Sequence, residues 1–414
     1  MIRKPAEFKD SISDLLFAIF VKLPIKYLLR LTAVCKSYRQ IIRSHEFKKF
    51  HHAEISIEDA HEYLLVHNRI GIEQWGLSIY SARTFRYDEN SGLPRYVAVP
   101  MRCVGIPLNS LGFTVYGSCY GLLCISLRSL DVDDPIFLYN PSLRKFKQLP
   151  QSDFKGPEDT IGHTTIICRE DVVTLGFGYH SGEDDYQVVR FVYPRRSIFH
   201  AEVYSLKLNS WTVLENVVDP REPGAWFMKR YAFLDGVIYW HLMQSAMSLV
   251  SFNMNTKVLE RRTLTVNLKQ VMRPICLQVL HPQCLRALRN DAQVSEKLLC
   301  LFQVNEVRQR DRRQQYCDIW DLKGNAEERI YSIPIEQCAS IAWQLGFSAS
   351  IAWPLGFSTN GNVAYMVITD ENQDLPYLAQ YALLLNRTQT RITQISEDWF
   401  VDAYKESLVL LDEN

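Results

Sequence analysis

The sequence lacks features that mark several large classes of protein. No apolar run approaches the ~20 residues that a membrane-spanning helix needs, because Lys, Arg or Asp interrupts the longest candidates. The first ten residues include Arg3, Lys4, Lys9 and Asp10 and contain no apolar stretch, so we expect no secretory signal. These absences predict a protein of the cytoplasm, the nucleus or both.

Paired metal ligands are also missing. The chain has 10 cysteines, yet no two of them form a C-x-x-C pair, and close-spaced pairs are typical of zinc sites. His51, His52 and His61 lie near acidic residues, but we expect them to be solvated side chains. The sequence therefore predicts buried free thiols, no metal site and no cofactor.

The chain has no net charge, with 46 Lys and Arg against 46 Asp and Glu. This balance excludes a dominantly basic nucleic-acid binder. The balance is uneven along the chain: residues 1–50 contain 11 basic and 4 acidic side chains, and the remaining 364 residues contain 35 and 42. A formal charge of +7 is thus followed by −7, which indicates two domains with different partners.

Residues 11–50 have the spacing of helices. Apolar residues recur at intervals of three and four from Leu15 to Leu23, Pro24 ends that helix, and a second amphipathic helix runs from Val34 to Ile42. About 40 residues cannot bury every apolar side chain of such helices alone. The unit therefore either docks on a partner or caps the rest of the chain.

From about residue 61 the period of the pattern changes to two. Short β-branched and aromatic segments such as 135–139, 186–192 and 201–206 predict strands. Asn-centred turns near residues 140, 209, 253 and 386 predict hairpins. The irregular spacing suits a β-propeller with inserted loops, and a large β-sandwich is the alternative.

A ten-residue segment occurs twice in succession. Residues 340–349 and 350–359 are identical at eight of ten positions. Only one copy can form the strand that leads into Gly361, and we expect the second copy to do so. The first copy is then a loop insertion that the fold tolerates or, as the alternative, a recognition loop.

Several short runs near the N-terminus resemble the F-box motif in its plant form. They are Asp14-Leu15-Leu16, Lys22-Leu23-Pro24-Ile25-Lys26, Leu28-Leu29-Arg30 and Val34-Cys35-Lys36-Ser37-Tyr38. The resemblance implies a three-helix module that binds a Skp-type adaptor and, through it, a cullin scaffold. It makes nine residues candidates for the adaptor-binding surface, some of which must pack the interior instead: Ile12, Leu15, Leu16, Leu23, Pro24, Leu28, Val34, Cys35 and Tyr38.

The remainder resembles the F-box-associated interaction domain of plant F-box proteins, which is related to kelch-like propellers. Segments 117–124, 139–146 and 236–240 carry much of this resemblance. It implies a small all-α F-box module at 1–50, a linker at 51–60 and a large all-β, β-propeller-like domain at 61–412. The S-locus F-box proteins share this architecture, and nothing in the sequence selects that subgroup.

The implied function is that of a non-catalytic substrate receptor in an SCF-type (Skp-cullin-F-box) ubiquitin ligase, with an unidentified target protein. The alternative is an interaction protein with weak adaptor binding or none. A nucleophile elbow around Cys119 is rejected because strand residues follow the glycine of its turn. Arginines at 308, 310, 312 and 313 form a basic segment that we interpret as a solvated insertion, with nucleic acid as the alternative.

Overall fold

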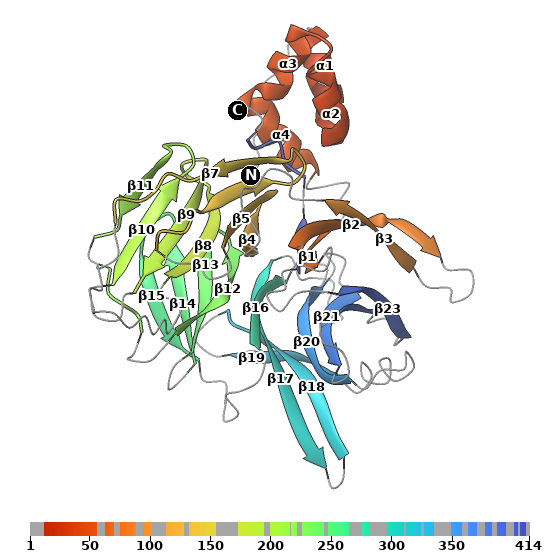
Figure 1. Ribbon diagram of the computed structural model, residues 1–414, viewed down its shortest axis with the longest axis vertical. Helices are drawn as coiled ribbons and strands as arrows, with labels where there is room; N and C mark the ends of the chain where they lie inside the picture. Colours follow the sequence, from red (N-terminus) through yellow and green to blue (C-terminus); the bar gives the residue numbers. More distant parts are fainter. Residues whose placement is uncertain are drawn as a thin grey trace, which may run out of the picture.

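The computed structural model describes residues 12–55, 63–69, 75–87, 94–101, 113–127, 132–154, 173–193, 199–215, 217–221, 226–243, 247–264, 275–280, 296–309, 312–323, 327–334, 349–357, 363–370, 377–382, 387–394, 401–404 and 406–410. These residues form a helical module followed by a large β domain (Figure 1). Across the described part of the chain, no helix is long and apolar enough to cross a membrane.

Four helices make up the N-terminal module: α1 (Ile12–Val21), α2 (Ile25–Leu31), α3 (Lys36–Arg43) and α4 (His45–Ile55). Pro24 stands just before α2, where its fixed φ angle and missing N–H do no harm. The expectation of three helices was wrong, since α4 adds a fourth. This helix continues five residues into the segment predicted as a linker.

The β domain is built from four-stranded antiparallel sheets, of which the described residues form six. Five of these sheets follow one another along the chain, and we call them blades 2 to 6; the sixth sheet, blade 1, is formed by the two ends of the β domain. Blade 2 contains β4 (Phe113–Cys119), β5 (Leu122–Leu127), β6 (Phe137–Asn140) and β7 (Lys145–Gln148); blade 3 contains β8 (Val173–His180), β9 (Asp185–Val192), β10 (His200–Ser205) and β11 (Ser210–Val213); and blade 4 contains β12 (Trp226–Leu234), β13 (Val237–Met243), β14 (Ser248–Asn253) and β15 (Leu259–Thr263). Blade 5 contains β16 (Ile275–Leu280), β17 (Leu298–Gln309), β18 (Arg312–Asp321) and β19 (Glu328–Pro334), and blade 6 contains β20 (Ala349–Phe357), β21 (Val363–Asp370), β22 (Tyr377–Ala382) and β23 (Arg387–Gln394).

Blade 1 joins the two ends of the β domain. It combines the last strand, β24 (Val401–Tyr404), with β1 (Tyr63–Arg69), β2 (Trp75–Tyr87) and β3 (Pro94–Met101). Strand β24 pairs with β1 in antiparallel register, with Tyr404 opposite Tyr63. The six sheets lie around a common centre (Figure 1). The predicted β-propeller-like fold is confirmed, and the β-sandwich alternative was wrong.

Tight hairpin turns require residues with positive φ. Tyr120 and Gly121 have φ of 44° and 83° between β4 and β5, and Asp235 and Gly236 repeat the arrangement in blade 4. Two successive positive φ angles match a type I′ turn, which suits the twist of the flanking strands. The turn predicted at Gly121 is therefore confirmed, and no helix follows Cys119 as a nucleophile elbow would require.

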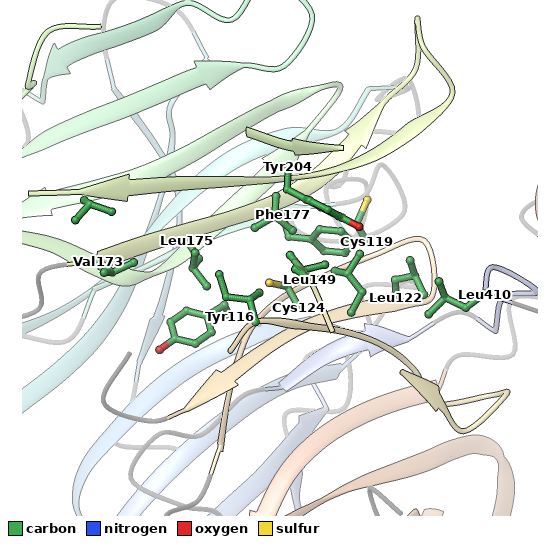
Figure 2. Packing of buried hydrophobic residues seen from close by; sticks show 14 residues of the cluster. Tyr116, Cys119, Leu122, Cys124, Leu149, Val173, Leu175, Phe177, Tyr204 and Leu410 are labelled. Atoms are coloured by element: carbon green, nitrogen blue, oxygen red, sulfur yellow. The ribbon is translucent and has the colours of Figure 1, made fainter. Parts of the chain in front are cut away.

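Aliphatic and aromatic side chains fill the space between neighbouring blades. Figure 2 shows the cluster between blades 2 and 3, in which Leu175 and Phe177 of β8 pack with Leu122 and Cys124 of β5. Gly117 of β4 has a role that the sequence did not indicate, because a Cβ atom there would overlap the hydroxyl of Tyr231. This glycine makes room for a side chain from blade 4.

The duplicated segment contributes one strand. Strand β20 contains most of the second copy and pairs with β21, with Phe357 opposite Ala364. The prediction that the second copy is the structural one is confirmed. Most of the first copy lies outside the described residues.

Candidate adaptor-binding surface and its connection to the β domain

The interior of the helical module is formed by apolar residues of all four helices. Phe20, Ile25, Leu28, Ile42 and Phe47 are buried there. Helix α4 supplies Phe47, whose ring makes an edge contact with that of Phe17 at a centroid distance of 5.2 Å. The four helices therefore supply most of this core, and it does not need the apolar residues that remain on their surface.

The nine residues predicted for the adaptor surface divide into distinct environments. Leu28 is fully buried and packs the interior. Half-buried Leu16, Leu23 and Tyr38 pack against the same core. The other four described residues of this set are exposed: Leu15, Pro24, Val34 and Cys35. The side chain of Ile12 lies outside the described residues.

Two further exposed apolar residues extend this surface. Ile19 is 48% exposed and follows Leu15, 64% exposed, by one helical turn on α1. Tyr27 on α2 is 50% exposed, and Val34 in the α2–α3 connection is 65% exposed. We call Leu15, Ile19, Tyr27 and Val34 the apolar surface of the module. Sequence spacing missed Tyr27 because it stands among the buried and half-buried residues of α2.

Cys35 has a structural role of its own. It caps α3, and its Sγ accepts a hydrogen bond from the Tyr38 backbone N–H at 3.5 Å. Arg39 stabilises the same corner by donating from Nε to the Thr32 carbonyl at 2.9 Å. These contacts fix the backbone beside Val34.

His51 joins α4 to the connection between α1 and α2. Its Nε2 lies 2.8 Å from the carbonyl oxygen of Leu23, and its side chain is buried. Burial lowers the pKa of His51, and the hydrogen bond to Leu23 partly opposes that change. The imidazole of His51 thus has a structural role, because it is buried and bonded to the backbone. The described residues contain no cluster of His, Cys, Asp or Glu that could hold a metal ion.

A short segment at the end of the chain joins the module to the β domain. We call residues 406–410 the C-terminal strap. Leu408 is buried in the core of the helical module, and Leu410 is buried in the cluster between blades 2 and 3 (Figure 2). Burying one leucine contributes roughly 1.5–3 kcal/mol. The strap therefore connects two hydrophobic cores through residues only two positions apart.

Asn140 of β6 holds the strap in place. Its Nδ2 donates to the carbonyl oxygens of Ser407 and Val409, both at 2.8 Å. The Oδ1 atom of Asn140 accepts from the Leu143 N–H at 3.2 Å, which stabilises the β6–β7 turn. Tyr404, just before the strap, lies with its hydroxyl 2.7 Å from Oγ of Ser142. One buried side chain therefore fixes the turn and the strap together.

The strap also contacts the beginning of α2. The Glu406 carboxylate forms a hydrogen bond with the Ile25 backbone, which lowers its pKa, but burial has the larger effect and raises it. A carboxylate at a helix N-terminus meets unpaired N–H groups and a favourable dipole. Glu406 thus links the strap to the helix that Pro24 precedes.

A second contact between the two domains is polar. His45 at the start of α4 lies 2.8 Å from Asp184 in the β8–β9 turn, and Lys49 lies 3.9 Å from it. A hydrogen bond from Tyr179 is the main cause that lowers the pKa of Asp184. Because His45 and Lys49 are exposed, these pairs are worth only ~0–1 kcal/mol each. The apolar and buried contacts of the strap dominate the connection.

Together these features define a two-part protein: a helical module with exposed apolar residues, whose core includes Leu408 of the strap, fastened to one side of a β-propeller-like domain. Two family descriptions match the chain, the F-box domain at residues 13–50 and the F-box associated beta propeller domain at residues 108–304. The chain belongs to the F-box proteins that carry an F-box-associated β-propeller domain.

Similar curated proteins are F-box proteins of Arabidopsis thaliana. F-box/kelch-repeat protein At3g23880 is 25% identical over 261 residues, or 58% of this chain and 62% of that protein. F-box protein CPR1 is 29% identical over 49% of this chain and 45% of its own length. F-box protein At4g22390 is 40% identical over 25% of this chain and 26% of its own length. The chain thus spans less than two thirds of each of these relatives.

Proposed function

We propose that this protein is the substrate-recognition subunit of an SCF-type ubiquitin ligase. Its F-box would dock a Skp-type adaptor, and its β domain would capture a target protein. The protein would carry out no chemistry itself. It would raise the concentration of the target near the ubiquitin-conjugating enzyme, which is a proximity effect. Such a receptor would act in the cytoplasm or the nucleus.

The observation that carries this proposal is the exposed apolar surface on a module whose core is already complete. Leu15 and Val34 are each about two-thirds exposed, although α4 and Leu408 close the core beneath. The module does cap the β domain through Leu408, yet this contact leaves Leu15 and Val34 uncovered. Exposed apolar groups that the fold does not need favour an interaction site.

Charge supports the same proposal. Lys22, Lys26 and Arg30 are exposed on or near α2, and residues 1–50 carry a formal charge of +7. The family resemblance implies an acidic adaptor. Opposite charges would speed the encounter more than they would strengthen the complex. Adaptor association should therefore slow as ionic strength rises.

Capture of a purified Skp-type adaptor tests the proposal. The double variant Leu15→Asp with Val34→Asp should lose capture and keep its melting temperature, because both side chains are exposed. A matched control is Leu208→Asp with Val213→Asp, which changes two exposed apolar residues of blade 3; this control should still capture the adaptor. If the unmutated chain captures no adaptor, the non-ligase interaction protein becomes the better account.

A further inference from the structure

Strand β11 forms the outer edge of blade 3 and has one unpaired side. The inner strand of this blade, β8, contacts β4 and β12 of the neighbouring blades, so β11 at the other end of the sheet lies outermost (Figure 1). It pairs with β10 on one side, and among the described residues no strand pairs with its other side. The backbone N–H and C=O groups of such an edge can pair with another strand.

The hydrogen bonds of β11 show which of its backbone groups face outward. The Leu214 N–H donates to the Ala201 carbonyl of β10 at 2.8 Å, so Leu214 belongs to a bonded pair. Bonded and non-bonded pairs alternate along antiparallel strands, and Thr212 is therefore bonded to β10 as well. Trp211 and Val213 then direct their N–H and C=O groups away from β10, toward the unpaired side.

The outer strands of the other blades contain residues that hinder such pairing. Strand β7 contains Lys145 and Lys147, and β15 contains Glu260, Arg261 and Arg262. The sequences of β3, β19 and β23 also include charged residues or proline. The sequence of β11, SWTV, includes neither. Because charged residues and proline protect sheet edges from pairing, β11 is the outer strand best suited to accept another strand.

Contacts within the β domain hold β11 in place while its outer side stays accessible. The indole N–H of Trp211 donates to the Pro150 carbonyl at 2.7 Å, and the Arg190 guanidinium carbon lies 5.1 Å from the centre of the indole ring. Thr212 and Val213 are exposed, Val213 by 55%. A strand that is already fixed loses little conformational freedom when a second strand is added to it.

The two ends of β11 carry opposite charges. Exposed Lys207 precedes the strand, where its Nζ donates to the Glu183 carbonyl at 3.0 Å, and exposed Glu215 follows the strand. A second β11 that lies antiparallel, with a two-fold axis at Trp211, brings Lys207 of each copy beside Glu215 of the other. The outward-facing backbone groups of the two strands then meet along the same line.

We propose that two copies of this chain associate by pairing their β11 strands. Each chain offers one such edge, so the assembly closes at two copies. Opposite charges at both ends favour the antiparallel arrangement, since a parallel one would place like charges together. The pairing does not depend on adaptor binding, because the apolar surface of the module lies on the helices.

Analytical ultracentrifugation of the full-length chain tests this proposal. The unmutated chain should form a dimer in equilibrium with the monomer, and no larger species. Val213→Lys should raise the dissociation constant about tenfold or more, because it places a charge on the pairing edge. Its melting temperature should not change, since this side chain is exposed. The matched control, Val258→Lys, alters an exposed valine beside β15 and should associate like the unmutated chain.

Charge reversal tests the antiparallel arrangement. Lys207→Glu brings two acidic residues together at each end of the dimer, and Glu215→Lys brings two basic residues together, so each variant alone should associate more weakly. An equal mixture of these two variants should form a mixed dimer, because opposite charges meet again at both ends. Restored association in the mixture separates a contact between chains from an effect within one chain.

Three results would overturn the proposal. They are an unmutated chain that stays monomeric at every concentration tested, equal association of Val213→Lys and Val258→Lys, and a mixture that associates no better than either charge variant alone. A monomeric chain in which a valine-threonine repeat peptide slows amide exchange at Trp211 and Val213 would assign the edge to a different protein.

Discussion

Replacing Asn140 with alanine should loosen the C-terminal strap from the β domain. The change removes two 2.8 Å hydrogen bonds to the carbonyl groups of Ser407 and Val409, and one from the Leu143 N–H. Each lost bond costs about 1 kcal/mol, and a buried group left without a partner costs about 1–3 kcal/mol. We expect the free energy needed to detach the strap to fall by about 2–4 kcal/mol. At the lower figure, the detached population rises about thirtyfold.

Amide hydrogen exchange can measure this change in the full-length chain. Exchange in the strap and at the start of α2 should accelerate, because Glu406 contacts Ile25 and Leu408 packs into the F-box core. The inner strands of blades 3 and 4 should keep their protection, since their pairing does not involve Asn140. The expected pattern is therefore local opening and not general unfolding.

Asn253→Ala provides a matched control. Asn253 begins the β14–β15 turn as Asn140 begins the β6–β7 turn, and its Oδ1 accepts from the N–H groups of Asn255 and Thr256. The described contacts of Asn253 do not include the strap. This variant should lose turn stability and leave strap exchange unchanged. Unchanged strap exchange in Asn140→Ala, or equal acceleration in both variants, would refute the account of the connection.

Three other predictions concern the β domain. Burial lowers the pKa of His241 to about 4 from an ordinary value of 6.5, so stability present above pH 6.5 should be lost as the pH falls toward 4. Between these pH values the free energy of unfolding should fall by about 3 kcal/mol. Urea denaturation at several pH values can measure this fall, which should be smaller in His241→Gln. Gly117→Ala should lower the free energy of unfolding by about 1–3 kcal/mol in urea denaturation, because its Cβ atom would overlap both the hydroxyl and the ring of Tyr231. Arg190 and Glu202 form a buried ion pair, so Arg190→Met, which leaves the Glu202 carboxylate without this partner, should lower the free energy of unfolding by about 3–5 kcal/mol. The double variant Arg190→Met with Glu202→Leu should lower it less, and urea denaturation of both variants can measure the difference.

The sequence predicted much of the fold because local patterns specify it. Alternating apolar residues and Asn-centred turns identified strands such as β6, β9 and β10 and the hairpins that begin at Asn140, Asn209 and Asn253. Helix α4 was missed because its residues, HEFKKFHHAEI, mix charged and aromatic side chains and resemble a polar linker. Phe47 and His51 belong to the core only because α4 packs against the other helices.

The sequence identified candidate residues for the adaptor surface, but it did not show which of them are exposed and which are buried. Leu15 and Leu28 occur at similar helical spacings, yet Leu15 is exposed and Leu28 fully buried, because the tertiary arrangement decides which side of each helix is covered. The strap could not have been predicted at all. Asn140 and Ser407 are 267 positions apart in the chain, and although segment 139–146 carries part of the family resemblance, no local pattern shows that these two residues meet.

The strap also bears on how a receptor of this kind would work. Leu408 and Leu410 anchor the F-box and the blades to the same short segment. A bound adaptor and a bound target would then be held at a defined separation, so proximity would depend on the folded connection and not on a flexible linker. The exposed surface and the strap would then have complementary roles.

The most direct test of the proposed role in an SCF-type ligase is to mix the purified full-length chain with a Skp-type adaptor and a cullin. Size-exclusion chromatography with mass measurement then shows which proteins assemble. We expect one complex that contains the three proteins in equal amounts, and we expect no such complex when Leu15→Asp and Val34→Asp are combined. Elution of the unmutated, folded chain apart from the adaptor would contradict this role.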